Sequence, residues 1–265
     1  MLNRAGRALS AALELRGRSV AFGAVLALLV AGRAEGQFSV QPVIMELRPG
    51  DSASVATFAV RNEAPEALQL RIYAADFDQP ESGSHTFTEA GTHARSCYDR
   101  LRLFPDNLTV PAKSEGQVRV RLEPGAGTCW SVVFVQSQAA GDGGIRIAQR
   151  IGVKVYGVAP DARPAGEVLA VDVTEAPADR AVSILFENTG EGPIRPEGEV
   201  EIRTTAGEIV AVVPVPPFSV LPGRSRQTRV PLDRPLEPGR YLAIPILDFG
   251  AEYLAADQAS FEVGG

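Results

Sequence analysis

The sequence predicts an all-β protein with two Ig-like β-sandwich domains that follow an N-terminal signal peptide and are joined by a short linker. Three observations predict this fold class. Short segments of alternating apolar and polar residues recur between turn residues, which is typical of β-sandwiches. A proline-containing segment divides them into two sets, and a basic, then apolar segment precedes both sets. The predicted boundaries are 1–36 for the signal peptide, 37–158 for the first domain, 159–166 for the linker and 167–265 for the second domain.

The first residues have the composition of a secretory signal peptide. Arginines precede an apolar run from Val20 to Ala31, and small residues follow it, among them Ala34 and Gly36. The run is shorter than the roughly 20 residues that span a bilayer. We therefore expect cleavage after Ala34 or Gly36, export, and no stable membrane insertion of the mature chain. The alternative is an uncleaved N-terminal segment that anchors the protein to the inner membrane.

The first domain is predicted from a series of short apolar runs. Turn residues such as Pro49-Gly50 and Pro124-Gly125 separate these runs. The polar segment from Gln79 to Arg95 lacks alternation and predicts a loop or a hairpin. The predicted strands are Phe38–Leu47, Ser54–Arg61, Leu68–Phe77, Leu108–Val110, Val118–Leu122, Trp130–Gln136 and a strand that begins at Ile145.

The second domain is predicted in the same way after the linker. Pro160 and Pro164 lie in this linker and should make it stiff. The predicted strands are Ala165–Val173, Val182–Glu187, Glu199–Arg203, Ile209–Val213, Gln227–Leu232, Tyr241–Leu247 and Gln258–Val263. Few residues remain for helices, so we expect low helix content.

Charge and cysteine content exclude several classes of protein. A net charge of −6 argues against nucleic acid as a main partner, because such proteins present a basic surface. Arg224, Arg226 and Arg229 follow Gly223 and predict a local basic edge. With two cysteines the chain is not a disulfide-dense scaffold. Cys97 and Cys129 can pair in an oxidising compartment, and two separate buried thiols are the alternative.

The sequence shows no convincing catalytic or metal site. His85, His93, Cys97 and Asp99 are near one another in the chain, but they lack the tight paired spacings of zinc sites. There is no G-x-S-x-G motif and no glycine-rich phosphate-binding motif. We therefore expect no enzyme, no catalytic residue, no metal and no cofactor.

The segment from Ile145 to Pro160 is the most informative part of the chain. Side chains alternate across a strand, so one face carries a nearly continuous apolar row. Lys154 and Tyr156 belong to the opposite face. At the end of a domain such a row either fills its own core or is lent to another protein. The row consists of Ile145, Ile147, Gln149, Ile151, Val153 and Val155.

These features together resemble the PapD-like periplasmic pilus-assembly chaperones, of which the chain looks like a divergent member from about Phe38 to Val263. The resemblance rests on export, on two sandwiches, and on short sequence patterns. The patterns are Phe38-Ser39-Val40, Leu47-Arg48-Pro49-Gly50, Ala59-Val60-Arg61-Asn62, and the positions of Ile145, Ile147, Gln149, Lys154, Tyr156 and Pro160. It implies a periplasmic chaperone that donates its last first-domain strand to an immature, pilin-like secreted subunit and works with an outer-membrane usher. The implied client-binding residues are Ile145, Ile147, Gln149, Ile151 and Lys154.

Two positions depart from that family's pattern. The family pairs the lysine with a first-strand arginine to bind the subunit's terminal carboxylate. Here that position falls at Gln41 or Val43, and Arg48 lies close to the turn. Gln149 stands where the family prefers a large apolar residue. The alternative function is a structural or adhesive Ig-like protein of the cell envelope, with every strand used internally.

Overall fold

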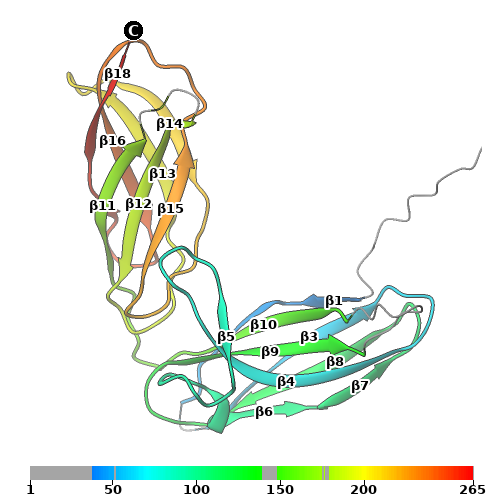
Figure 1. Cartoon of the computed structure of the whole chain (residues 1–265). Coiled ribbons are helices and arrows are strands. Elements are labelled where there is room, and N and C mark those ends of the chain that lie inside the picture. The colour runs from blue at the N-terminus through cyan, green and yellow to red at the C-terminus, as the bar shows by residue number, and fades with distance from the viewer. Residues whose placement is uncertain (1–37, 51, 139–147, 175, 177–178, 265) are drawn as a thin grey trace, which may run out of the picture. The chain divides into compact units, whose positions relative to one another are not determined.

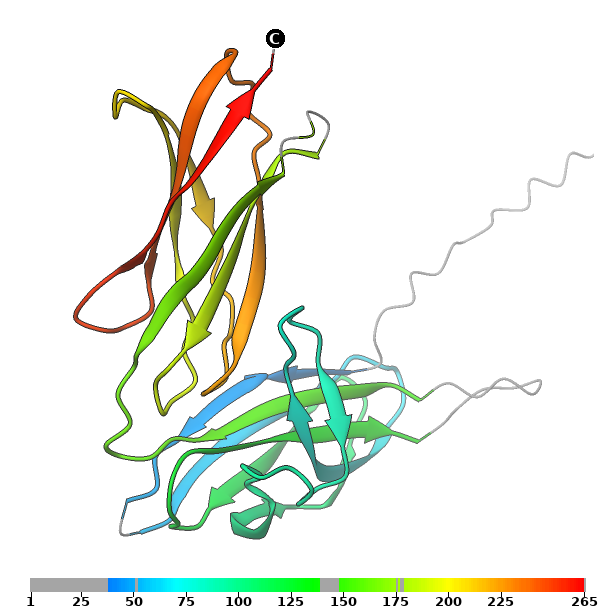
Figure 2. The same cartoon turned by 60° about the vertical axis from the view of Figure 1, so that its left-hand side comes forward.

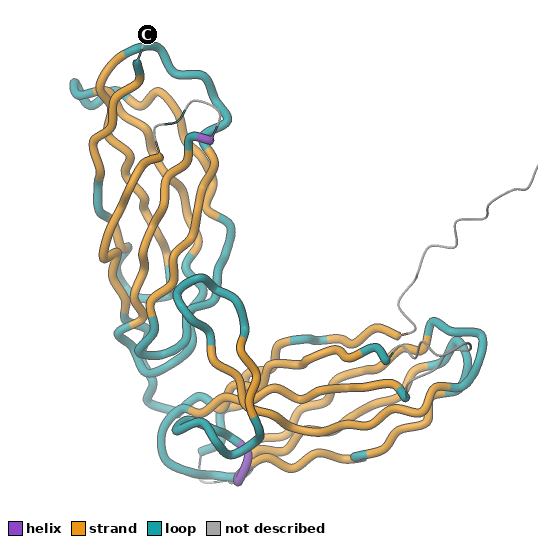
Figure 3. Tube along the Cα trace, viewed as in Figure 1, coloured by secondary structure: helices purple, strands orange, loops and turns teal. Residues whose placement is uncertain are grey.

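The computed structural model describes residues 38–50, 52–138, 148–174, 176 and 179–264 (Figure 1). These residues belong to one compact unit, Glu35–Gly265, and strands make up nearly all of its regular structure (Figure 3). Two sandwiches, each with its own core, confirm the predicted all-β fold class. The expected signal peptide, residues 1–36, lies outside the described residues. Within the described part of the chain, no helix is long and apolar enough to cross a membrane.

The first sandwich contains ten strands in two sheets. One sheet has the order β1-β3-β8-β6, and the other has the order β2-β10-β9-β4-β5, with β7 also paired to β4. The strands are β1 (Phe38–Gln41), β2 (Ile44–Leu47), β3 (Ser54–Asn62), β4 (Leu68–Asp78), β5 (Thr86–Thr88), β6 (Leu101–Phe104), β7 (Asn107–Val110), β8 (Glu115–Leu122), β9 (Cys129–Ser137) and β10 (Arg150–Gly157).

The core of this sandwich follows from alternation along its strands. On β8, Val118, Val120 and Leu122 are fully buried, whereas Arg119 and Arg121 point to solvent. Because every second side chain faces the opposite sheet, such a pattern buries one apolar face per strand. β9 differs, since both of its faces are buried. The second face of its sheet is therefore also covered.

The first predicted strand, Phe38–Leu47, is two strands, and that prediction was wrong. β1 pairs with β3 in one sheet, and β2 runs parallel to β10 in the other. The break falls at Pro42, which has no N–H to contribute to a ladder. The chain changes sheets at this point, and β2 thereby becomes a neighbour of β10.

The polar segment from Gln79 to Arg95 contains a hairpin, one of the two predicted outcomes. Phe77 pairs with Phe87, so β5 adds a strand to the sheet beside the last three residues of β4. In Figure 2 this hairpin projects from the first sandwich. The Phe87 ring meets the Phe134 ring edge-on at 5.2 Å. The hairpin thus helps to cover the second face of the sheet.

The second sandwich has a three-stranded sheet, β11-β12-β15, and a five-stranded sheet with the order β14-β13-β16-β17, in which β18 also pairs with β16. Ile184, Phe186, Val200 and Ile202 are fully buried between the two sheets. The strands are β11 (Gly166–Thr174), β12 (Ala181–Asn188), β13 (Glu197–Thr204), β14 (Ile209–Val215), β15 (Ser225–Pro231), β16 (Gly239–Asp248), β17 (Ala255–Ala256) and β18 (Ala259–Val263).

Candidate functional site

β10 has an edge that is only partly covered. It pairs with β9 along its whole length, from Arg150 to Gly157. On its other side it pairs with β2 only from Lys154 onward. No described strand pairs with the first half, Arg150–Val153, on that side. We call Arg150–Val153 the open edge of β10.

Alternation of the backbone identifies the groups that face this open edge. The Lys154 N–H donates to the Val43 carbonyl, toward β2, at 2.9 Å. The Ser137 N–H donates to the Gln149 carbonyl, toward β9, at 2.9 Å. Successive residues of a strand point their N–H and C=O groups to opposite sides. The N–H and C=O groups of Arg150 and Gly152 therefore point to the open edge, where another strand can pair with them.

The apolar row of β10 divides into parts with different surroundings. Val153 and Val155 are fully buried in the first core, and Ile151 is half-buried against it. From Ile151 onward the row therefore packs in its own sandwich. Ile145 and Ile147, the two isoleucines implied to bind a client, lie outside the described residues.

Gln149 contacts the start of β1 through its side chain. The Gln149 amide nitrogen donates to the Phe38 carbonyl at 3.1 Å, and the Phe38 N–H donates to the Gln149 amide oxygen at 3.4 Å. One side chain thus forms hydrogen bonds with both the N–H and the carbonyl of Phe38, the first residue of β1. This pairing gives a physical reason for a polar residue at a position where an apolar one was expected.

The opposite face of β10 carries Lys154 and Tyr156. Tyr156 is buried, and burial raises its pKa to about 12. Its ring lies 6.1 Å from the Phe77 ring, and the Lys154 Nζ lies 5.9 Å from the centre of that same ring. Burial, together with the positive charges of Arg195 and Arg226, lowers the pKa of Lys154. No described side chain forms an ion pair or hydrogen bond with the ammonium group of Lys154.

Further cationic groups lie near Lys154. The His85 ring lies 5.9 Å from the Phe77 ring. Burial, Lys154 and Arg226 all lower the pKa of His85. Arg226 of β15 donates from Nη1 to the Ser219 carbonyl at 3.1 Å, and burial lowers its pKa as well. We call Lys154, His85, Arg195 and Arg226 the cation cluster.

Two atoms of this cluster are buried without a hydrogen-bond partner among the described residues. They are His85 Nε2 and Arg226 Nε. A buried polar atom without a partner costs about 1–3 kcal/mol, so most such atoms in native proteins are paired. The cluster therefore has unused hydrogen-bonding capacity in this structure.

The three arginines of the predicted basic edge have different partners. Arg224 makes two bonds to the Asp78 carboxylate, at 3.1 and 2.6 Å. Arg229 pairs with Asp179 at 2.7 Å. Arg226 has no acidic partner among the described residues. The sequence reasoning grouped the three and could not identify Arg226 as the one with a free donor.

The first strand supplies no cation to this cluster. Gln41 is exposed, and Val43 is half exposed. Arg48 lies 3.7 Å from Glu46, measured from Nη2 to Oε2, and both side chains are largely exposed. Cations near Lys154 come instead from Arg195 and Arg226, which follow β12 in the sequence.

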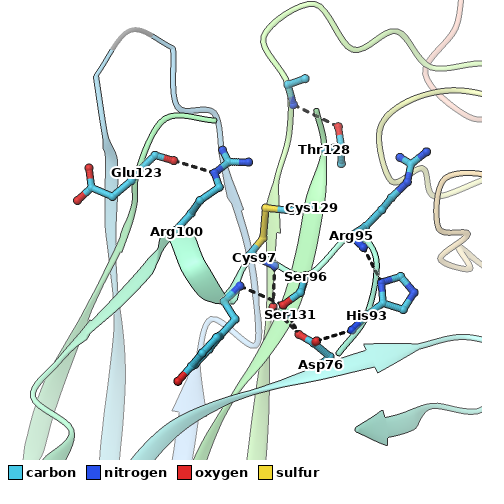
Figure 4. The surroundings of a disulfide bond; sticks show 12 residues. Asp76, His93, Arg95, Ser96, Cys97, Arg100, Glu123, Thr128, Cys129 and Ser131 are labelled. Atoms are coloured by element: carbon cyan, nitrogen blue, oxygen red, sulfur yellow. Dashed lines mark hydrogen bonds between the residues drawn. A yellow bond between two sulfur atoms is a disulfide. The ribbon is translucent and has the colours of Figure 1, made fainter. Parts of the chain in front are cut away.

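The predicted pairing of Cys97 and Cys129 is confirmed (Figure 4). A buried carboxylate holds the segment that carries Cys97. Asp76 accepts bonds from the Ser96 hydroxyl at 2.6 Å, the Ser131 hydroxyl at 3.1 Å and the His93 N–H at 2.9 Å. The Cys97 N–H in turn donates to the Ser131 hydroxyl at 3.1 Å. Asp76 thus fixes Cys97 opposite Cys129.

The four residues considered for a metal have other roles. Cys97 is in the disulfide, His93 packs 5.1 Å from the Trp130 ring, and His85 packs against Phe77. Asp99 is exposed on the short helix η1 (Tyr98–Arg100). No group of three or more His, Cys, Asp or Glu side chains in the described ranges is arranged to hold a metal ion.

The sequence matches no family profile and no curated protein. Solved structures to which the chain is similar include the class 5 fimbriae chaperone CfaA, with 10% identity, a TM-score of 0.49, and coverage of 86% of this chain and 99% of that chain. Another is the E. coli chaperone DraB, with 13% identity, a TM-score of 0.41, and coverage of 85% and 96%. A third is the CsuC-CsuE chaperone-tip adhesion subunit complex of Acinetobacter baumannii, with 11% identity, a TM-score of 0.44, and coverage of 86% and 98%.

Proposed function

We propose that this protein is a periplasmic chaperone that binds an immature, pilin-like secreted subunit by lending it a strand. The strand is the open edge of β10 together with the segment from Ile145 that precedes it. The open edge is the observation that carries the proposal. β2 leaves Arg150–Val153 unpaired on one side, although the rest of β10 is paired on both sides.

Strand addition explains how such an edge binds. A subunit that lacks its last strand has unpaired backbone groups and an open core. The backbone groups of Arg150 and Gly152 pair with the subunit's sheet. Ile145 and Ile147 fill its core, and each fully buried isoleucine contributes roughly 1.5–3 kcal/mol. Two such side chains and a ladder hold the subunit without catalytic chemistry, so the protein acts as a chaperone and not as an enzyme.

Lys154 fixes the register of the added strand. It follows the open edge by one residue and has a partly desolvated ammonium group with no acidic partner among the described residues. The terminal carboxylate of the subunit is a ligand of matching charge, and charge-assisted bonds in a partly dry site are strong. With this end held, the apolar residues of the donated strand enter the correct sites of the subunit.

The proposed place of action is the periplasm, and the proposed further partner is an outer-membrane usher. Residues 1–36 supply the export signal, and the oxidising compartment agrees with the Cys97–Cys129 disulfide. Retention at the inner membrane by an uncleaved segment is the alternative location.

A structural or adhesive envelope protein is the second candidate. The burial of Val153 and Val155 in their own core favours it, because this half of the apolar row is used internally. The two functions differ at Ile145 and Ile147. A chaperone keeps these side chains for a client, whereas a structural module packs them in its own sandwich.

Co-expression distinguishes the two functions. The mature chain is expressed in the periplasm with the secreted subunits encoded beside its gene, and stable pairs are isolated. We expect Ile147→Asp to abolish the pair while the circular dichroism spectrum and the Tm stay unchanged. Val55→Asp, at an exposed valine of β3, is the control and should leave the pair intact. Unfolding of Ile147→Asp, or absence of any pair with the wild-type chain, would contradict the chaperone function.

A further inference from the structure

The missing first-strand arginine raises a question about anion binding at Lys154. Gln41 and Val43 bring no charge, and Arg48 is engaged with Glu46. A single lysine holds a carboxylate weakly in water, because hydration competes for both charges. A site that selects a carboxylate needs a second donor with a fixed direction.

The second sandwich supplies such a donor. Arg226 lies on β15, and its Nε is buried without a partner among the described residues. The guanidinium is held in place from several sides. It lies 5.8 Å from the Phe218 ring, and it donates to the Ser219 carbonyl. A planar guanidinium fixed in this way presents its remaining N–H groups in fixed directions.

The β4–β5 hairpin closes around this guanidinium. A Cβ added at Gly83 would lie only 2.6 Å from Arg226 Nε, so glycine at this position lets the hairpin backbone approach the guanidinium without displacing it. The Gln227 N–H donates to the Glu81 carbonyl at 2.9 Å, which ties the hairpin to β15. His85 follows Gly83 by two residues and carries the second unpartnered atom, Nε2.

Acidic side chains of the neighbouring strands are already engaged. Asp78 at the end of β4 holds Arg224, and Glu46 of β2 lies beside Arg48. Among the residues that the structure describes, the cation cluster therefore has no carboxylate partner to neutralise it. In addition to burial, the charges of Arg195 and Arg226 lower the pKa of Lys154, and those of Lys154 and Arg226 lower the pKa of His85. A bound anion would relieve this repulsion.

We propose that Lys154 and Arg226, with His85 as a third donor, form a carboxylate-binding site in which the arginine of the second sandwich replaces the absent first-strand arginine. This inference rests on the proposed function, because the carboxylate is assigned to the C-terminus of the bound subunit. Arg195 adds positive potential near Lys154. Binding there would join the donated strand to both sandwiches of the chain.

A small carboxylate that cannot pair as a strand tests the anion site separately from strand addition. N-acetylalanine carries one carboxylate and no backbone long enough to form a ladder, and N-acetylalaninamide is its neutral match. The full mature chain is titrated with each at pH 7.5 while the NMR signals of the His85 imidazole are followed. We expect N-acetylalanine to shift these signals with a millimolar Kd and to raise the His85 pKa. The amide should do neither.

Substitutions test whether Arg226 is the second donor to the carboxylate. Arg226→Gln should weaken N-acetylalanine binding about tenfold, and Arg226→Lys should weaken it less. Lys154→Met should abolish it. Arg229→Gln removes an arginine of the same strand that is paired with Asp179, and it should leave binding unchanged. Circular dichroism and Tm of each variant verify that it is folded.

Several results would overturn this assignment. Absence of binding up to 100 mM N-acetylalanine, or equal binding by Arg226→Gln and Arg229→Gln, would do so. Tighter binding of inorganic phosphate than of N-acetylalanine would show that the site prefers another anion. If N-acetylalanine binds as expected but no subunit forms a pair, the chaperone function fails while the anion site stands. If subunits pair but Arg226→Gln has no effect on the probe, only this inference fails.

Discussion

Cys97 and Cys129 are joined by a disulfide, with their Cα atoms 5.0 Å apart, and they are separated by 32 positions in the sequence. Closing a loop of this length stabilises a protein by about 3–4 kcal/mol on the chain-entropy account. We expect the double variant Cys97→Ala, Cys129→Ala to lose about that amount in urea denaturation. Both cysteines are buried, so the native wild-type chain should resist reduction by dithiothreitol until it unfolds. Rapid reduction of the folded chain would contradict this.

The carboxylate of Asp76 should be required for rapid formation of this disulfide. It is fully buried and accepts bonds from Ser96, Ser131 and the His93 backbone. Asp76→Ala leaves these donors without an acceptor, at a cost of about 1–3 kcal/mol for each donor that stays buried and unpaired. We expect slower loss of free thiols during oxidative refolding and a lower urea midpoint.

Asp99→Asn is the matched control for Asp76, since Asp99 is an exposed acid of the same segment. It should refold and oxidise at the wild-type rate. Asp76→Asn keeps one acceptor oxygen and should fall between the two. Equal oxidation rates of Asp76→Ala and wild type would mean that the Cys97 segment is positioned by other contacts.

Alternation along the chain was sufficient to predict most strands. β3, β4, β8 and β9 each combine a regular apolar row with a turn signal at both ends, so local sequence and tertiary pairing agree. β6 was missed because its four residues, Leu101–Phe104, provide too short a row to recognise. The split between β1 and β2 was missed because alternation continues across Pro42, whereas the change of sheet depends on partners far away in sequence.

The candidate site was less accessible to sequence reasoning. Lys154 was identified from its position near the end of a recognisable strand, and no described residue is its acidic partner. Arg226 could not be separated from Arg224 and Arg229, because only tertiary contacts distinguish them: Asp78 and Asp179 each engage one of the other two. The side-chain bonds of Gln149 to Phe38 are likewise contacts over 111 positions that no local pattern records.

Glycine at position 157 should be required at the end of β10. A Cβ there would overlap the Leu122 side chain and lie 2.8 Å from the Cys129 sulfur. Overpacking of this kind costs about 1–3 kcal/mol. We expect Gly157→Ala to lower the urea midpoint accordingly. Gly50→Ala, where a Cβ would meet nothing within 4 Å, is the control and should change stability little.

Because of the ion pair between Asp78 and Arg224, the folding stability should fall at low pH. Burial alone would raise the Asp78 pKa, but the bonds from Arg224 and from the Gln79 N–H, with the charge of Arg224, lower it below 3.8. A carboxylate with a lowered folded-state pKa contributes stability that is present above its unfolded pKa and is lost as pH falls through the folded value. We expect the Tm difference between wild type and Asp78→Asn to be constant above pH 5 and to shrink below pH 4.

An exposed acid of the second sandwich provides the comparison for Asp78. Asp172 on β11 is exposed, and its carboxylate forms no ion pair or hydrogen bond with a described residue, so Asp172→Asn should show the wild-type dependence of Tm on pH. A Tm difference for Asp78→Asn that stays constant down to pH 2 would show that the charge of Asp78 does not contribute to folding.

Lys154 should lower the folding stability of the unbound chain, although it binds the proposed ligand. Burial, Arg195 and Arg226 lower its pKa, so the unfolded state holds its proton more tightly than the folded state does. Stability therefore rises with pH between the folded pKa and the ordinary value of 10.5. Lys154→Met removes the unpaired charge and keeps an unbranched side chain beside Phe77. We expect a Tm about 2–4 °C above wild type at pH 7, and we expect that the stability of the variant no longer rises toward pH 10.

A residue that lowers stability but binds an anion is expected where function, and not folding, maintains that residue. A lower Tm for Lys154→Met would mean that Lys154 is held by structural contacts and would remove this reason to regard it as a ligand-binding residue.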